Sequence, residues 1–290
     1  MITPDKIKAL TIKGLVSDDE LMETLILKGG NAISLGHNIS NRASYDLDFS
    51  IIDGDFKKEL KEIGTIMETS LADTFKNEGY HLFDFKIQAK PAVSKEGTVD
   101  FWGGYAVEFK IISNELYGKN KKDIDSVRRN AIAYLPNNSP KIQIEISKHE
   151  FVESPEAHQI DGLTFYVYPL KLIVFEKLRA ICQQVPEYSS VIPSFTPRAR
   201  AKDFYDIYIL LEESGISIED NQNKDILRKV FDAKKVPYDF LRKIRENKEI
   251  HEQNFASLRD TVPAIEKENL KDFDFYFNYV VDFFENYLEN

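Results

Sequence analysis

Hydrophobic periodicity changes along the chain, and this change narrows the possible folds. Residues 81–89, 105–112 and 141–147 each alternate apolar and polar side chains with period two, which is typical of half-buried strands. Residues 56–75 place apolar side chains at helical spacing instead. Several strands beside a helix predict an α+β sheet domain.

Beyond about residue 165 the pattern becomes helical. Pro169 is suited to a first helical turn and precedes a run with apolar residues at helical spacing. Further helices are predicted over residues 201–211 and 269–288. We therefore expect two closely packed parts, an α+β domain over residues 1–160 and a helical C-terminal domain over residues 161–290.

Composition limits the kind of protein. Cys182 is the only cysteine, so no intramolecular disulfide can form, which fits a reducing compartment. No stretch approaches the roughly 20 apolar residues of a membrane span, and the N-terminus lacks an apolar signal core. We expect a cytoplasmic protein with no membrane contact.

The formal net charge is −10, so the surface as a whole does not favour nucleic acid. Any such contact must be local. Residues 119–129, with three Lys and two Arg against two Asp, are one candidate, and a solvated loop with a helix start is the equally good alternative.

A glycine pair interrupts residues 21–35, which otherwise read as a short helix. Gly29 and Gly30 let the backbone turn tightly and let a ligand approach the main chain closely. If a helix begins there, its free N–H groups could bind phosphate, with Asn31 as a further donor. On its own, a glycine pair is more often an ordinary turn.

Two carboxylates follow within 20 residues, on a strand predicted over residues 45–51. Asp46 and Asp48 share one face of that strand. Two charges about 4 Å apart repel by roughly 4 kcal/mol at an effective dielectric near 20, so the pair calls for a cation. Oxygen-rich sites suit Mg²⁺, which retains waters and substrate phosphates as its other ligands. The alternative is a polar strand face open to water.

Other residues extend this candidate site. Ser44 falls on the same face if the strand begins early, and Arg42 could steady a phosphate, steady the carboxylates or simply pair with an Asp. A two-metal site for phosphoryl transfer favours a third carboxylate. Glu145 is the best candidate, because Ile144 and Ile146 form the buried face of its strand; the alternative is an ordinary exposed residue.

These motifs, taken in order, resemble the AbiEii/AbiGii toxin family. They are K-G-G-N-A from Lys28, R-x-S-x-D-x-D from Arg42, a strand with an acidic residue, E-K-L-R-A from Glu176 and R-A-K-D-F-Y-D from Arg200. The resemblance covers about residues 25–211. It implies a nucleotidyltransferase fold of the DNA polymerase beta superfamily, with a mixed sheet followed by helices that complete the active-site cleft. The family's members are toxins of bacterial type IV toxin–antitoxin and phage-defence (abortive infection) systems.

The resemblance adds residues that periodicity does not single out. Lys177 would face the triphosphate, and Lys202, Asp203 and Asp206 would line the same cleft. The alternative for this last group is a cap and ion-pair cluster on one helix. Two departures bear on the site: Gly30-Asn31 stands where Gly-Ser is usual, and the third acid is Glu145 rather than Asp.

The function implied is a nucleotidyltransferase toxin that uses Mg²⁺ or Mn²⁺ and a nucleoside triphosphate. Asp46, Asp48 and Glu145 would hold the metal, and Lys177 and Asp203 complete the catalytic set. The acceptor implied is RNA, the 3′ end of tRNA, so that translation stops, and a cognate antitoxin is the implied partner. Transfer to protein, with Ser44 as one acceptor, and a catalytically silent nucleotide-binding module remain alternatives. We expect no metal set among the five histidines and no nucleophilic role for Cys182.

Overall fold

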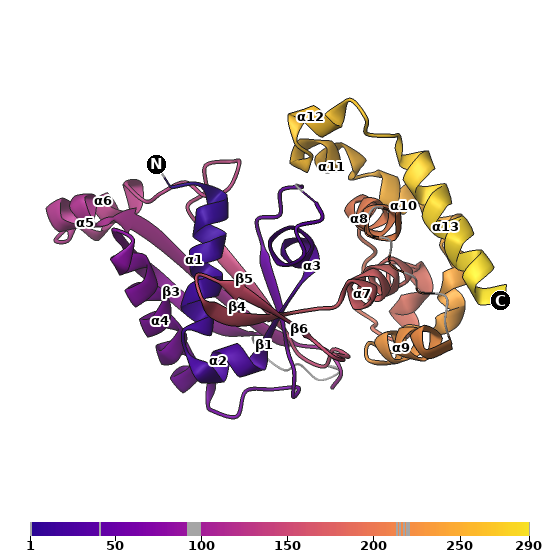
Figure 1. The fold of residues 1–290 in the computed structure, drawn as a ribbon, viewed down its shortest axis with the longest axis horizontal. Helices are drawn as coiled ribbons and strands as arrows, with labels where there is room; N and C mark the ends of the chain where they lie inside the picture. The colour runs from indigo at the N-terminus through magenta and orange to yellow at the C-terminus, as the bar shows by residue number, and fades with distance from the viewer. Residues whose placement is uncertain are drawn as a thin grey trace.

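A seven-stranded mixed sheet forms the frame of the computed structural model, which describes residues 2–40, 42–91, 100–212, 214, 216, 218 and 221–289 (Figure 1). The strand order is β3-β4-β5-β2-β1-β7-β6. The pairs β2–β5 and β1–β7 are parallel and the other neighbours are antiparallel. The strands are β1 (Leu25–Lys28), β2 (Leu47–Ile51), β3 (Tyr80–Lys90), β4 (Gly104–Ser113), β5 (Ile142–Ser147), β6 (Glu156–Ile160) and β7 (Leu163–Val167).

Two helices, α1 and α4, pack against each other and against the sheet. Helix α1 begins at Pro4, where the Thr3 hydroxyl accepts a hydrogen bond from the Lys6 amide and caps the first turn. In α4, residues at helical spacing, among them Ile63, Met67 and Leu71, are fully buried. The shorter helices of this part are α2, the α3–η1 run and the pair α5 and α6. Their bounds are α1 (Pro4–Val16), α2 (Asp19–Thr24), α3 (Gly29–Asn31), η1 (Ala32–Gly36), α4 (Leu60–Asn77), α5 (Asn114–Asn120) and α6 (Ile124–Arg129).

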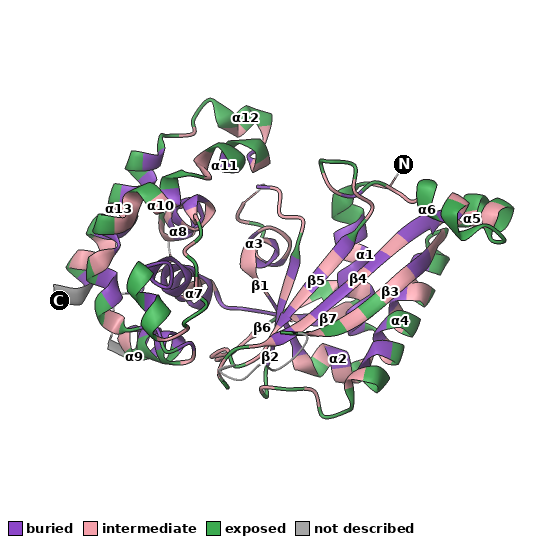
Figure 2. Cartoon of the chain, turned by 180° about the vertical axis from the view of Figure 1, so that it is seen from behind, coloured by how far each residue is buried: buried purple, intermediate pink, exposed green. Residues whose placement is uncertain are grey.

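The remaining helices gather beside one end of the sheet (Figures 1 and 2). Phe204 of α8 contacts Phe273 and Phe277 of α13 through its ring, which shows that the aromatic stripe of the last helix is core packing. These elements are α7 (Leu170–Cys182), η2 (Pro186–Ser190), α8 (Ala201–Glu212), α9 (Asn221–Asp232), η3 (Tyr238–Lys243), η4 (Arg245–Asn247), α10 (Lys248–Glu252), α11 (Phe255–Thr261), α12 (Ala264–Lys267) and α13 (Phe273–Glu289).

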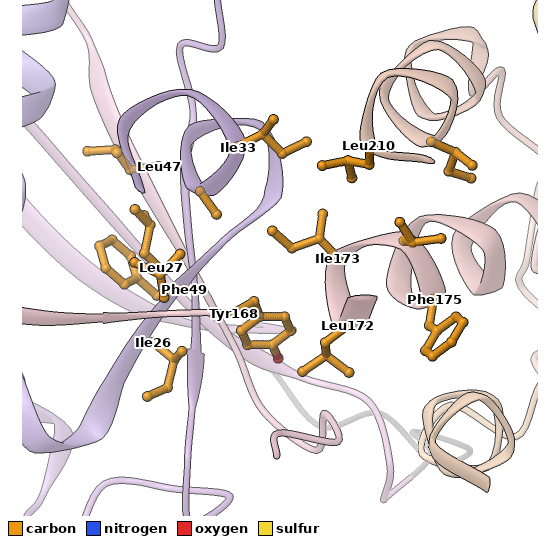
Figure 3. Packing of buried hydrophobic residues seen from close by; sticks show 14 of the residues in the cluster. Ile26, Leu27, Ile33, Leu47, Phe49, Tyr168, Leu172, Ile173, Phe175 and Leu210 are labelled. Atoms are coloured by element: carbon orange, nitrogen blue, oxygen red, sulfur yellow. The ribbon is translucent and has the colours of Figure 1, made fainter. Parts of the chain in front are cut away.

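A continuous apolar core joins the sheet to the helices (Figure 3). Leu27 and Phe49 from neighbouring strands, Tyr168 after β7 and Ile173 on α7 belong to the same buried cluster. The Tyr168 hydroxyl also donates to Ser50 Oγ at 2.7 Å. The sheet and the helical part therefore share one core.

The predicted α+β class is confirmed, and four predicted strands and four helices appear close to their expected bounds. The helix expected over residues 21–35 is wrong in its middle, because Leu25–Lys28 forms the short strand β1. Its first three residues are fully buried, so they show no period-two alternation. The sheet also continues to β7, past residue 160, so the proposed division at residue 160 stays a prediction. None of the described helices is both long and apolar enough to cross a membrane.

Candidate active site

A cleft of about 540 Å³ lies between the sheet and the helical part. Its sheet side carries the glycine turn and the acidic strand ends, and its helical side carries cations from α7 and α8. The predicted site residues that line it are Gly29, Gly30, Arg42, Ser44, Asp46, Asp48, Glu145, Lys177, Lys202 and Asp203. The structure thus brings together residues that are up to 174 positions apart, from Gly29 to Asp203.

Strand pairing places the three predicted metal-ligating acids at one edge of the cleft. Asp48 of β2 is in register with Glu145 of the parallel strand β5, and Asp46 directly precedes β2. Burial raises the pKa of Asp48 to about 7, and the carboxylates of Glu145 and Asp46 add to the rise against the opposing effect of Lys28. Burial and Glu145 also raise the pKa of Asp46. Asp46 and Asp48 therefore both resist ionisation, as expected of ligands that need a cation.

Glu145 is the acid whose present contacts compete with such a role. Its Oε1 accepts hydrogen bonds from Lys90 Nζ at 2.8 Å and from Gln143 Nε2 at 3.0 Å. Within the described chain, the acids of the cleft do not offer three ligand atoms all within 4.8 Å of one another. Glu145 must leave Lys90 to join Asp46 and Asp48 around one ion.

The glycine turn lies directly on the acidic strand. Gly29 has φ +69°, and a Cβ there would lie 2.6 Å from Asp48 Oδ2. A Cβ on Gly30 would lie 2.9 Å from Ser44 Oγ and 3.0 Å from Arg42 Nη2. The conformation of Gly29 therefore favours glycine, and a side chain at Gly30 would displace Ser44 or Arg42. The main chain of the turn borders the carboxylates.

Asn31 has a different role from the one predicted. It is fully buried, and its Nδ2 donates to the main-chain oxygen of Asp46 at 2.6 Å. Its side chain does not line the cleft. A phosphate contact through this side chain does not fit the arrangement; Asn31 instead holds the chain segment that presents Asp46.

On the helical side, each acid has cationic partners. Asp206 accepts two hydrogen bonds from Arg42, at 2.9 and 2.8 Å, and one from Lys177 Nζ at 2.7 Å. Although burial opposes its ionisation, Arg42 and Lys177 hold the pKa of Asp206 at about 2. Asp203 accepts from Lys177 at 3.0 Å and pairs with Arg200 at 3.3 Å.

This network corrects the predicted role of Asp206, which is buried and does not line the cleft. Its carboxylate positions Arg42 and Lys177, and the bidentate pair explains why Arg42 is not a free phosphate ligand. Of the predicted alternatives for Arg42, the pair with an Asp is the one observed, although the pair is buried.

Lys202 differs from the other cations of the cleft. It lines the cleft, yet it forms no ion pair with any acid in the part of the chain that the structure describes. Burial and the nearby Arg42 lower its pKa. Lys202 thus takes no part in the ion-pair cluster that was the alternative for this group, and it presents a charge to the cleft.

Sequence reasoning missed a second buried charge network on the cleft wall. Lys28 Nζ lies 2.9 Å from Glu150 and 3.5 Å from Glu176, and Arg179 contacts Glu176 at 3.1 Å. Burial and Glu150 raise the pKa of Glu176. The sequence did indicate one pair of this network, because Glu176 and Arg179 are i, i+3 neighbours within E-K-L-R-A. Glu150, in a loop after β5, had no such pattern.

The basic segment at residues 119–129 lies at the far end of the sheet from the helical part, on α5 and α6 (Figure 1). Lys119 pairs with Glu115, Arg128 with Asp84 and Arg129 with Asp123. Most of its charge is therefore compensated locally, as the solvated-helix alternative predicts.

Strand-borne acids that face a glycine turn and helix-borne cations, on a mixed sheet with a helical second half, are the architecture of a nucleotidyltransferase. Comparison with protein families agrees with this class. The family model described as "Nucleotidyl transferase AbiEii toxin, Type IV TA system" matches residues 12–279. The chain belongs to this family of nucleotidyltransferase toxins.

Solved structures show more distant similarity. JHP933 from Helicobacter pylori is 17% identical, with a TM-score of 0.49 over 98% of this chain and 91% of that one. A putative nucleotidyltransferase from H. pylori has the same identity and TM-score over 99% and 95%. The nucleotidyltransferase toxin MenT4 (Rv2826c) from Mycobacterium tuberculosis H37Rv is 17% identical, with a TM-score of 0.40 over 84% and 64%. The search among curated proteins gave no match. The family assignment rests on the family model alone.

Proposed function

We propose that the protein transfers a nucleoside monophosphate from a nucleoside triphosphate to a hydroxyl of RNA, at the 3′ end of tRNA, and thereby blocks translation. The observation that carries the chemistry is the arrangement of Asp46, Asp48 and Glu145 opposite Lys177 and Lys202 across one cleft. Acids on one wall and cations on the other match a substrate that is a metal-bound polyphosphate.

The residues present fit Mg²⁺ or Mn²⁺. The donors are carboxylate oxygens. Burial and the neighbouring carboxylates raise the pKa of Asp46 and of Asp48, and a divalent cation would offset both effects. Asp46 and Asp48 would hold the ion, and Glu145 would join them after leaving Lys90. When bound, the ion neutralises phosphate charge and orients the phosphate groups for attack.

The other residues then have defined tasks. The main chain of Gly29 and Gly30 borders the phosphates, Lys202 supplies a free cation, and Lys177 is held at the cleft by Asp203 and Asp206. The acceptor oxygen forms a bond to the α-phosphorus while the bond from that phosphorus to the pyrophosphate oxygen breaks. The hydroxyl proton passes to the carboxylate of Glu145, and positioning with charge stabilisation supplies the catalysis.

A local surface supports an RNA acceptor despite the net charge of −10. Trp102 is 44% exposed and lines both the cleft and an adjoining hollow of about 240 Å³ that also contains Lys90, Tyr105 and Lys148. Lys234 Nζ lies 5.2 Å from the Trp102 ring centroid. Exposed aromatic rings beside lysines are how proteins bind single strands, and stacking of one base contributes about 1–3 kcal/mol.

Ser44 supports a second candidate, in which the nucleotide is transferred to the protein itself or to its antitoxin. Ser44 lines the cleft two residues before Asp46. The family implies an antitoxin partner. For this second activity, we propose that the protein contacts its antitoxin directly. For either activity, we propose that it is located in the cytoplasm.

The test is to incubate the pure protein with Mg²⁺, each labelled nucleoside triphosphate in turn and total bacterial tRNA. Asp46→Ala is the inactive variant, and Asp73→Ala, an exposed acid on α4, is the matched control. Label on tRNA with wild type and Asp73→Ala only is the expected result. If label appears on protein alone, is confirmed by intact mass and is lost in Ser44→Ala, the acceptor is Ser44 of the protein and not tRNA. Nucleotide binding without any transfer would leave a binding module and overturn the proposal.

A further inference from the structure

Two histidines that are 121 positions apart in sequence meet outside the cleft. The rings of His37 and His158 lie 5.1 Å apart, at an interplanar angle of 84°. Glu156 Oε2 lies 3.9 Å from His37 Nδ1 and 3.9 Å from His158 Nε2. No metal set was expected among the histidines, but His37 and His158 lie close enough, together with Glu156, to hold a metal ion.

The fold explains how these three side chains meet. Glu156 and His158 are two residues apart on β6, so they share one face of this edge strand. His37 directly follows η1, and a Cβ on Gly36 would lie 2.8 Å from Val167 Cγ1. Val167 is the β7 partner of Glu156. The glycine thus lets the helix lie against β7 and brings the next residue to Glu156.

The spacing is close to that of a coordination site. One ligand atom from each of the three residues lies within 4.8 Å of the other two. At the limit of 4.8 Å between all three atoms, the point equidistant from them lies about 2.8 Å from each, compared with about 2.0–2.2 Å for zinc bonds to histidine and carboxylate. Glu156 is exposed and His158 is half-buried, so small rotations of their side chains can shorten these distances to the length of a zinc bond.

The tautomer of His37 is also fixed in the required way. His37 Nε2 lies 2.8 Å from the main-chain oxygen of Tyr168, and a carbonyl oxygen only accepts. Nε2 therefore carries the hydrogen, and Nδ1 presents its lone pair toward Glu156. A histidine whose second nitrogen donates to a carbonyl is the usual outer-shell arrangement of a metal ligand.

We propose that His37, Glu156 and His158 form a metal site, separate from the catalytic cleft, for a divalent ion of borderline softness such as Zn²⁺. Two imidazoles and one carboxylate suit such an ion better than Mg²⁺, which prefers oxygen ligands. Water completes the coordination on the exposed side. The site fastens the end of the glycine-turn helix to the edge of the sheet, next to Tyr168, which precedes α7.

The experiment titrates the metal-free protein with Co²⁺ in excess Mg²⁺, which competes for the carboxylates of the cleft. We expect one Co²⁺ per chain, with the intense visible absorption of a four-coordinate site that contains nitrogen ligands. Zn²⁺ should displace Co²⁺ and raise the melting temperature. His158→Ala and Glu156→Gln, both on exposed or half-buried positions, should each weaken binding by at least about tenfold.

His81→Ala is the matched control, because His81 lies on β3 and stacks on Tyr117, away from this group. It should bind Co²⁺ as wild type does. Equal affinity in wild type and His158→Ala would overturn the proposal, as would the absence of the absorption in wild type.

Discussion

The two walls of the cleft hold acids in opposite electrostatic states. On the sheet, Asp48 has a pKa raised to about 7, chiefly by burial, with other carboxylates close by. On the helices, Asp206 has a pKa of about 2, because Arg42 and Lys177 outweigh its burial. Both acids belong to D-containing motifs of the same family pattern. Asp48 therefore lacks an ion-pair partner among the described residues and needs a cation that the ligand must bring, whereas Asp206 already has two.

The most severe loss of activity should come from a substitution on the sheet wall, at a proposed metal ligand. Asp48→Asn should reduce nucleotide transfer by about a thousandfold or more, since the metal loses a ligand in the transition state. The circular dichroism spectrum should remain that of wild type. Transfer at a tenth of the wild-type rate or better would remove Asp48 from the metal site.

The next effect concerns stability on the helical wall. Asp206→Ala leaves Arg42 and Lys177 buried without their shared partner, which should lower the free energy of unfolding by about 3–5 kcal/mol. Urea unfolding measures this loss. Adding Arg42→Met to Asp206→Ala should recover part of it, and a loss below about 1 kcal/mol in the single variant would contradict the compensated state of this wall.

The pH dependence of stability should have opposite signs at the two acids. Because the folded pKa of Asp48 exceeds its unfolded value of 3.8, the folded state binds the extra proton, and stability falls as pH rises from about 4 to 7. Asp206 instead stabilises above its unfolded pKa, and this stability is lost as pH falls toward 2.

In metal-free protein at pH 8, Asp48→Asn should therefore raise the free energy of unfolding, by about 2 kcal/mol after allowance for partial exposure of the side chain. Urea unfolding at pH 5 and pH 8 gives the comparison with wild type. A variant that is less stable than wild type at pH 8 would show that the carboxylate is already compensated.

The smallest expected effect is that of the metal on the free protein. Mg²⁺ at pH 8 should raise the melting temperature by about 2–4 °C, because it binds the folded state only. Differential scanning calorimetry should show this rise in wild type and in Asp73→Ala, and no rise in Asp48→Asn. An equal rise in all three would place the Mg²⁺ elsewhere.

Sequence patterns predicted the parts of the fold where one face is exposed. The alternating strands β3, β4 and β5 and the stripe of α4 carry their periodicity openly. Strand β1 does not, because Leu25, Ile26 and Leu27 are all buried and a continuous apolar run fits a helix or a strand. Strands β6 and β7 were not predicted, because their sequences show no clear alternation of apolar and polar residues.

The candidate site followed the same division. Asp46, Asp48 and Glu145 could be chosen because residues two apart share a strand face. The tasks of Asn31, Arg42 and Asp206 depend on partners up to 164 residues away, and no local spacing contains that information. Glu150 and the meeting of His37 with His158 depend on the packing of loops and edge strands in the same way.

The most direct test of the account is the carboxyl titration of Asp48 and Asp206 by carbon-13 NMR, on protein labelled at aspartate side chains. Asp48→Asn and Asp206→Asn assign the two signals, and each titration is run without and with Mg²⁺. We expect the pKa of Asp48 to be near 7 without Mg²⁺ and several units lower with it, whereas the pKa of Asp206 should be near 2 in both. An Asp48 signal that titrates near its ordinary value of 3.8 without Mg²⁺, and does not move on its addition, would contradict the central claim.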